Sequence, residues 1–235
     1  MVRINEREIL ENPGLPDHIV ERAYRDIAGI HRFLGDTRAI VNAIRADPQP
    51  VHRILDVGCG TGVVLKHVGD ALNVDVVGAD IQPRPRVSAP VPIVRADACC
   101  DPLPSADVAI CMYLCHHLPP HDVVRMIRNV GRYCRRFILL DLVRHPVPLA
   151  LFRAFVAPLI CDVDAQDGRR SIRRSYTTAE LHDLTVLALQ GSGASFRPTL
   201  TPFWLRQVID ISYAPLEDEP KSAVSLTVEE ERCLR

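Results

Sequence analysis

The chain has 235 residues, of which 47% are hydrophobic and 24% are charged. These values fit a soluble globular protein, either one α/β domain with a decoration or two small domains. The formal net charge of -1 gives no electrostatic basis for a nucleic-acid or anionic-membrane partner. No segment reaches the ~18 apolar residues that a membrane-spanning helix requires, and the first residues lack the apolar core of a signal peptide. We therefore expect a cytoplasmic protein that binds neither nucleic acid nor a membrane.

Apolar residues recur every three or four positions before residue 50, and this spacing predicts two helices. The first covers residues 17–34 with Asp17 as its cap and ends at Gly35, and the second follows with Asp36 as its cap. We expect residues 1–48 to form an N-terminal helical lid.

Five short apolar segments further along the chain predict β-strands, with helical patterns between some of them. The predicted strands cover residues 51–57, 74–80, 92–97, 108–113 and 136–141, and the helices cover residues 63–68 and 121–133. Apolar strands that alternate with helices are typical of a parallel sheet covered on both faces. The sequence therefore predicts a doubly wound, Rossmann-like α/β fold with a mostly parallel sheet and right-handed crossovers.

The alternation of strands and helices stops after residue 141. The remaining predicted elements are an apolar helix at 148–160, a polar loop at 162–174 and an antiparallel C-terminal hairpin at 195–201 and 203–211. Thr177-Thr-Ala-Glu180 has the capping-box pattern that opens a further helix. We expect the main domain to cover residues 49–212, with a helical insert at about 146–190 and a flexible tail at 213–235.

Glycines cluster directly after the first predicted strand, in the segment Asp56-Val-Gly-Cys-Gly-Thr-Gly62. Glycine lets the backbone approach a ligand at the carboxyl edge of a sheet, where ligands bind in doubly wound folds. A dinucleotide fingerprint requires glycine or alanine where this chain has Val63, and a P-loop requires a lysine that this segment lacks. Asp80, about twenty residues further on, can accept hydrogen bonds from both ribose hydroxyls and would repel a 2′-phosphate. A nicotinamide dehydrogenase is therefore disfavoured.

Residues 54–62, Asp80, Asp97-Ala98 and residues 107–118 together resemble the class I S-adenosylmethionine-dependent methyltransferases. The resemblance covers about residues 51–145 and implies S-adenosylmethionine as the cofactor. The cofactor-binding residues that it implies are Asp56, Gly58, Cys59, Gly60, Asp80, Ile81 and Asp97, with the Ala98 N–H beside the adenine and the Cys111 carbonyl facing the methionine ammonium.

The same resemblance assigns a role to each of these cofactor-binding residues. Gly58 and Gly60 approach the methionine part of the cofactor, and Asp56 orders its amino group through water. Asp80 holds the ribose, and Asp97 accepts from the adenine amino group. The alternative is that the three acids merely solvate strand ends, which would require a coincidence at three successive strand ends.

Two histidines follow the fourth predicted strand, in the segment Tyr113-Leu-Cys-His-His117. A phenolic acceptor must lose a proton, and a histidine that titrates near neutral pH can take it. His117 or His116 is the predicted base, and the alternative is that these histidines only cap the following helix. Tyr113 and His145 are predicted to contact the substrate, although a solvent-facing loop is an alternative position for His145.

Potential metal ligands are also concentrated in this region of the sequence. They are Cys111, Cys115, His116, His117 and His121. Two adjacent histidines and a cysteine inside a strand do not converge easily on one ion, so no metal is predicted. The eight cysteines are scattered and form no C-x-x-C pair, and we interpret them as reduced thiols.

Residues 24–38 and 167–176 look like the bacterial methyltransferases of aromatic polyketide pathways. By this looser resemblance Arg38 meets the methionine carboxylate, with an exposed helix arginine as the alternative. Arg169, Arg170, Arg173 and Arg174 are interpreted as part of a solvated loop, not as a grip for an anion or RNA.

The leading hypothesis is O-methylation of a small hydrophobic phenol or polyketide-type metabolite in a pocket beneath the helical lid. One alternative is methylation of a small molecule at carbon or nitrogen. Another is a catalytically inactive protein that keeps the fold and only binds. The pattern leaves the acceptor and the oligomeric state open.

Overall fold

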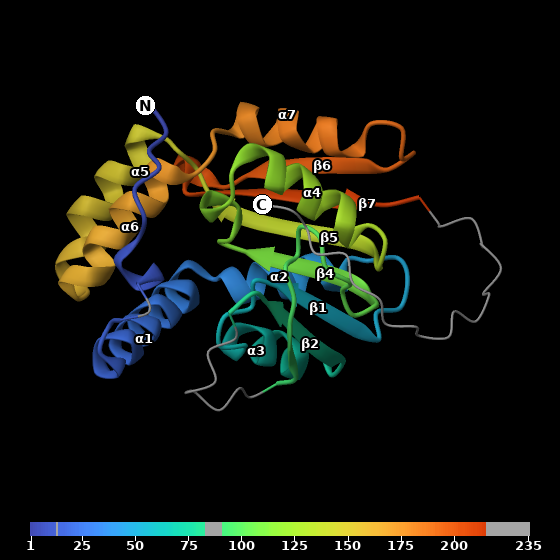
Figure 1. Cartoon of the computed structure of the whole chain (residues 1–235), viewed down its shortest axis with the longest axis horizontal. Coiled ribbons are helices and arrows are strands. Elements are labelled where there is room, and N and C mark those ends of the chain that lie inside the picture. The colour runs from blue at the N-terminus through green and yellow to red at the C-terminus, as the bar shows by residue number, and fades with distance from the viewer. Residues whose placement is uncertain (13, 83–90, 215–235) are drawn as a thin grey trace.

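The computed structural model of the chain describes residues 1–12, 14–82 and 91–214 (Figure 1). A seven-stranded sheet runs through its centre in the order β3-β2-β1-β4-β5-β7-β6. Neighbouring strands are parallel from β3 to β5, whereas β7 is antiparallel to both β5 and β6. The predicted doubly wound sheet with a C-terminal antiparallel hairpin is confirmed.

The elements have the following bounds. The strands are β1 (Arg53–Val57), β2 (Asp75–Asp80), β3 (Ile93–Arg95), β4 (Ala106–Met112), β5 (Cys134–Leu142), β6 (Ser195–Leu200) and β7 (Arg206–Ser212). The α-helices are α1 (Asp17–Leu34), α2 (Asp36–Arg45), α3 (Val63–Leu72), α4 (Pro120–Val130), α5 (Pro146–Leu151), α6 (Asp162–Arg174) and α7 (Thr178–Leu189). The short helical turns that matter below are η1 (Ile9–Glu11) and η2 (Cys115–His117).

Alternate residues of the central strands pack against different helices, so the sheet has a core on each face. On one face, Ile54 and Ile110 pack with residues of α2 and α3. On the other face, Leu55 and Cys111 pack with residues of α4 and α7. Because both side-chain directions are buried, the strands are almost continuous apolar runs in the sequence. The predicted placement of helices on both faces is confirmed.

The strand order reverses at β1, which pairs with β2 on one side and with β4 on the other. The chain leaves these two neighbouring strands toward opposite faces, since α3 follows β1 and α4 follows β4. Ligands of open α/β sheets bind outside the carboxyl ends of the strands at such a switch point. The glycine loop after β1 and the histidine segment after β4 therefore lie at the edge where a ligand is expected.

Three helices and the N-terminal segment stand together at one end of the sheet, as Figure 1 shows for α1, α5 and α6. Helix α5 continues into a π-helical turn at Phe152–Val156 and a 3-10 turn at Ala157–Leu159. The Ile4 N–H donates to the Arg173 carbonyl over 3.3 Å, so the N-terminal segment runs along α6. Because α5 directly follows β5, this group lies beside the carboxyl ends of the central strands.

The prediction of a polar loop at residues 162–174 is wrong, because this segment is α6. Its acids Asp162 and Asp164 lie in the first turn and its arginines Arg173 and Arg174 in the last, which favours the helix dipole. Much of its buried face is polar, and Asp167 is one of the buried residues. The apolar periodicity that reveals a helix in a sequence is therefore weak here.

The helix starts show two different outcomes. At α7 the predicted capping box is present, since Thr177 Oγ1 accepts from the Glu180 N–H over 3.2 Å and the Glu180 side chain accepts from the Thr177 N–H over 2.9 Å. At α2 the cap position is Gly35, and Asp36 is wholly buried within the helix. Asp36 does not cap the helix because its side chain faces Tyr113 and Arg206.

Parts of two predictions fall outside the described residues. They are the side chain of Asp17 and residues 215–235 of the predicted tail. Tyr213, where that tail was expected to begin, is held by a 2.6 Å hydrogen bond from its hydroxyl to the Ile127 carbonyl. None of the described helices is long and apolar enough to cross a membrane.

Candidate functional site

The loop after β1 is held in a conformation that favours glycine. Gly58, Gly60 and Gly62 all have positive φ, at 73°, 55° and 72°. The Gly58 N–H donates to the Ala79 carbonyl over 2.8 Å, and the Gly60 N–H donates to Asp80 Oδ2 over 2.9 Å. The glycine loop is thus tied to the carboxyl end of β2.

Gly58 also allows the loops after β1 and β4 to approach each other. A Cβ at this position would lie 2.8 Å from Cδ2 of Leu114, closer than real Cβ contacts allow. Cys59 fills the space above Gly78 in a similar way, since a Cβ on Gly78 would lie 2.4 Å from the Cys59 sulfur. The glycine loop therefore lies directly against the segment that carries the two histidines.

Asp56 is the most deeply buried of the three strand-end acids, with 3% of its surface exposed. Burial, reinforced by the nearby charge of Asp80, raises the pKa of the Asp56 carboxyl to about 8. A buried carboxyl with a raised pKa is poised to ionise when a cation arrives beside it. This property agrees with the part predicted for Asp56 beside the methionine amino group.

We expect the stability of the unliganded protein to depend on pH through Asp56. Its pKa is 3.8 in the unfolded reference and about 8 in the folded chain, so between these values mainly the unfolded chain ionises. An Asp56→Asn variant should therefore gain stability relative to the wild type as pH rises from about 4, with the gain levelling off above about pH 8. Thermal unfolding across this window measures the difference. A stability difference between Asp56→Asn and the wild type that does not change with pH would contradict this prediction. The matched control is Asp75→Asn, which removes an exposed acid of β2.

Asp80 and Asp97 follow neighbouring strands, since β2 pairs with β3. Asp80 accepts from the Gly60 and Gln82 N–H groups, while Asp97 Oδ1 accepts from the Cys99 N–H over 2.8 Å. Ile81, next to Asp80, has 56% of its surface exposed. An exposed apolar side chain beside two acids fits contact with a nucleoside.

The remaining predicted cofactor residues take different positions. Ala98 is partly buried, and its carbonyl accepts from Asn129 Nδ2 over 3.0 Å. Cys111 is fully buried near the end of β4, so its side chain belongs to the core. Arg38 is exposed on α2. Its part at the methionine carboxylate stays a prediction.

Tyr113 links the segment after β4 to α2. Its φ is 58°, which is unusual for an aromatic residue, and its hydroxyl donates to Asp36 Oδ2 over 2.7 Å. Burial raises its pKa well above the usual range. Asp36, which is fully buried, also pairs with Arg206, so a network of three residues holds this segment. The Tyr113 hydroxyl is thus engaged in this network.

His116 is buried and held by Asp141. The Asp141 carboxylate accepts from the His116 main-chain N–H over 3.0 Å and lies 2.7 Å from its Nδ1. A carboxylate is an acceptor, so we assign the imidazole proton to Nδ1 and the lone pair to Nε2. The free lone pair faces Glu8, whose Oε1 lies 3.6 Å from His116 Nε2.

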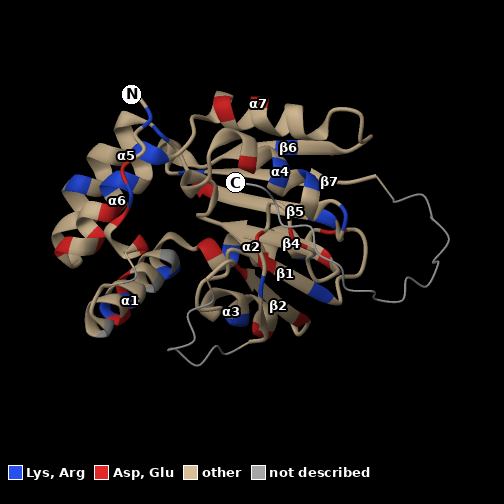
Figure 2. Cartoon of the chain, viewed as in Figure 1, with Lys and Arg blue, Asp and Glu red and all other residues tan. Residues whose placement is uncertain are grey.

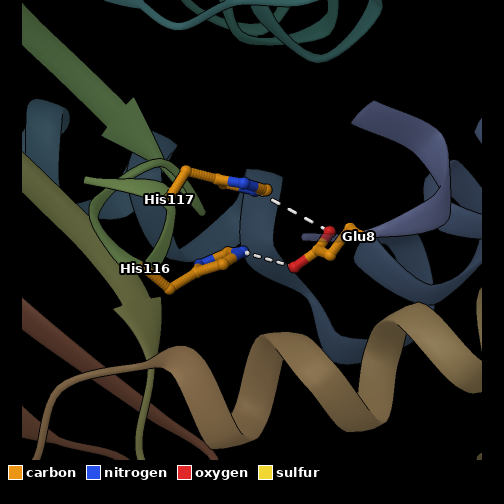
Figure 3. A group of neighbouring side chains, drawn as sticks. All are labelled: Glu8, His116 and His117. Carbon is orange, nitrogen blue, oxygen red and sulfur yellow. Dashed lines mark ion pairs between the residues drawn. The ribbon is translucent and has the colours of Figure 1, made fainter. Parts of the chain in front are cut away.

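His117 repeats this arrangement with a different carboxylate. Its Nδ1 lies 2.8 Å from Glu11 Oε1, and its Nε2 lies 3.9 Å from Glu8 Oε2. Burial raises the pKa of the Glu11 carboxyl, but the hydrogen bonds that it accepts from His117 and Arg174 outweigh burial and lower the pKa to about 2. Glu11 is therefore a carboxylate at neutral pH. Figure 3 shows both imidazole rings directed at Glu8.

Glu8 is a functional candidate that sequence analysis missed. Ser171 donates a 2.6 Å hydrogen bond to Glu8 Oε1, and Asp167 accepts from the N–H groups of Ile9 and Leu10. These contacts dock η1 on α6 and bring Glu8 to the histidines. Glu8 and Ser171 are 163 positions apart, so no local pattern could have indicated this contact.

The arginines of α6 are correspondingly not part of a solvated loop. Arg174 is buried, with 8% of its surface exposed, and pairs with Glu11 and more distantly with Glu8. Arg170 pairs with Asp167 over 3.1 Å. Figure 2 shows acidic and basic residues interspersed on α1 and α6, with no stripe of one sign.

Two further predicted residues lie in separate settings. His145 is the cap of α5, where its Nδ1 accepts from the Val147 N–H over 3.2 Å, and its ring stacks on Trp204 at 4.6 Å. It is partly buried, and its contact with the substrate stays a prediction. His121 is largely exposed on α4 and lies 3.3 Å from Asp122. Of the cysteines and histidines considered as metal ligands from the sequence, only His116 and His117 belong to a compact ligand cluster among the described residues.

The comparisons with known proteins agree with this geometry. Residues 54–136 match the family described as "Methyltransferase domain". The plantazolicin methyltransferase BpumL in complex with SAH has 13% sequence identity and a TM-score of 0.65, over 86% of this chain and 92% of that one. Human N-acetylserotonin methyltransferase in complex with SAM has 17% identity and a TM-score of 0.58, over 88% of this chain and 63% of that one.

A third solved structure is magnesium protoporphyrin IX methyltransferase from Synechocystis PCC 6803 with bound SAH. It has 15% identity and a TM-score of 0.52, over 87% of this chain and 91% of that one. Among curated proteins, none matches the sequence significantly.

Residues 54–136 therefore match a methyltransferase domain, and the chain has the fold of the class I S-adenosylmethionine-dependent methyltransferases. The predicted fold is confirmed, and the prediction of a methyltransferase is confirmed for the matched residues 54–136. The solved structures of this fold hold SAM or SAH, which agrees with the predicted methyl donor. The parts of individual site residues remain predictions.

Proposed function

We propose that the chain transfers the methyl group of S-adenosylmethionine to an oxygen of a small hydrophobic acceptor of phenolic or polyketide type. The observation that carries this proposal is the pair of carboxylate-bound histidines directly after β4. Leu114, two residues before His116, contacts the glycine loop. The pair therefore adjoins the part of the site where the methionine end of the cofactor is expected.

Methyl transfer from a sulfonium needs in-line positioning, and a phenolic acceptor must in addition lose a proton. His117 is the better placed base, because 29% of its side chain is exposed whereas His116 has only 4%. Its Nδ1 contact with Glu11 orients the ring and leaves Nε2 to take the proton. His116, held by Asp141, would orient the acceptor.

The helices beside the site support a hydrophobic acceptor. Phe33 on α1 and Phe155 beyond α5 are largely exposed, as is Leu159. Exposed apolar side chains on a group of helices beside a cofactor edge are suited to bind an apolar ligand. Two of the fold neighbours are named for N-acetylserotonin and magnesium protoporphyrin IX.

Two measurements test the proposed function. Isothermal titration with S-adenosylhomocysteine should show binding to the full chain. A panel of phenols with matched thiol, amine and carbon-acid analogues should then show methylation at oxygen with labelled S-adenosylmethionine. Transfer only to carbon or nitrogen would replace the O-methylation, and binding without turnover across the panel would favour a non-catalytic protein.

A further inference from the structure

Three ligand atoms from two distant parts of the chain surround one point beside the cofactor edge. They are a carboxylate oxygen of Glu8 and one imidazole nitrogen each of His116 and His117, and they lie within 4.8 Å of one another. We propose that these three residues form a binding site for a divalent transition metal of the zinc class. The site itself stands on this geometry, and its use for the acceptor rests on the proposed function.

The spacing of the three atoms fits an ion better than it fits direct hydrogen bonds. The two distances from Glu8 oxygens to the Nε2 atoms are 3.6 and 3.9 Å, beyond hydrogen-bond range. Ligands at about 2.0–2.2 Å from a tetrahedral Zn²⁺ lie about 3.4 Å from one another. The two distances from Glu8 to the imidazoles exceed this spacing by only a few tenths of an ångström.

The outer contacts of the histidines are those of metal ligands. A metal-bound imidazole usually donates its second N–H to a carboxylate, which fixes the ring and its tautomer. Both rings have such a partner, Asp141 at 2.7 Å from His116 Nδ1 and Glu11 at 2.8 Å from His117 Nδ1. Both Nε2 atoms then carry their lone pairs toward Glu8, which is the arrangement a cation requires.

The charges around the cluster also favour a cation. The carboxyl groups of Glu8, Glu11 and Asp141 contact the two imidazoles, and Arg174 is the cation that pairs with the first two. Ser171 donates to Glu8 Oε1 and so orients the carboxylate. Histidine nitrogens with one carboxylate oxygen form the ligand set of several catalytic zinc sites, in which a fourth position stays open.

An ion at this site would deepen the proposed function. The acceptor oxygen would take the fourth position, where the bound metal would lower its pKa so that it releases its proton to solvent water. With the ion bound, the Nε2 atoms are ligands and no longer bases. Proton removal by His117 then describes the metal-free protein, and proton loss at the metal describes the loaded one.

Metal binding is measured on the full chain after chelator treatment, without methyl donor or acceptor. Titration with Zn²⁺, and with Co²⁺ as a spectroscopic probe, should show about one equivalent bound, with imidazole coordination in the Co²⁺ spectrum. Glu8→Gln and His117→Ala should each weaken Zn²⁺ binding by at least about 10-fold to 100-fold. This is the usual effect of losing a residue that only contacts a metal ligand, and losing a ligand itself should cost no less. The matched control His121→Ala removes an exposed histidine and should leave the affinity unchanged.

A second readout separates loss of a ligand from loss of the fold. Glu8→Gln keeps the shape of the side chain and an oxygen that can accept from Ser171, so circular dichroism and S-adenosylhomocysteine affinity should match those of the wild type. The proposal is overturned if the wild type binds no Zn²⁺, or if the variants bind it as the wild type does. These assays include no methyl transfer. A chain that binds no Zn²⁺ therefore does not contradict the proposed function, and a chain that transfers no methyl group does not contradict the metal site.

Discussion

Replacing Asp80 with alanine is expected to weaken S-adenosylhomocysteine binding by about 100-fold or more. Two hydrogen bonds from ribose hydroxyls to a carboxylate contribute about 1.5–3 kcal/mol each, and each 1.4 kcal/mol is a tenfold change in affinity. The loss should be large because Asp80 also accepts from the Gly60 and Gln82 N–H groups, so its removal loosens the glycine loop.

Isothermal titration of the purified variants measures this effect. Asp75→Ala removes an exposed acid at the opposite end of the same strand and should bind like the wild type. Asp80→Asn, which keeps an acceptor oxygen but loses the charge, should lie between the two. An Asp80→Ala affinity within about threefold of the wild type would remove Asp80 from the cofactor site.

The second large effect concerns turnover. In chelator-treated protein, His117→Ala should lower kcat for a phenolic acceptor by about 10²-fold to 10⁴-fold, the usual contribution of a general base. The reason is that the side chain of His117 is the more accessible of the two imidazoles beside the glycine loop. S-adenosylhomocysteine affinity should not change, because the lost group acts on the acceptor.

Kinetics with a fixed acceptor and saturating methyl donor measure this prediction. His121→Ala is again the control, and His116→Ala should raise KM more than it lowers kcat if His116 orients the acceptor. Full turnover in both His117→Ala and His116→Ala would show that neither histidine is the base. A more acidic acceptor should recover part of the rate in His117→Ala, because it ionises without help.

The nucleotide-binding half of the fold could be predicted from local patterns. The strands from β1 to β5 are short apolar runs, and the glycines at 58, 60 and 62 stand where positive φ is required. Such features depend on neighbours in sequence, so they are visible without the structure. The three acids at the ends of β1, β2 and β3 follow from the same alternation, because parallel strands end at one edge.

The acceptor side of the site could not be predicted in the same way. Helix α6 was missed because its buried positions include Asp167 and Arg174, whose burial is compensated by hydrogen bonds and an ion pair with η1 and not by apolar character. Asp36 was expected to cap α2, yet it reaches Tyr113, which is 77 positions away. The energetic reason for each position lies in a distant residue.

The histidine pair shows both sides of this division. Sequence alone placed His116 and His117 after β4, at the edge where a methyl donor is expected. Only the tertiary structure set Asp141 and Glu11 against their Nδ1 atoms and brought Glu8 to their Nε2 atoms. Polar groups that are buried together must form hydrogen bonds or ion pairs with one another. Which groups meet here depends on how η1 docks on α6, and no local sequence pattern encodes that contact.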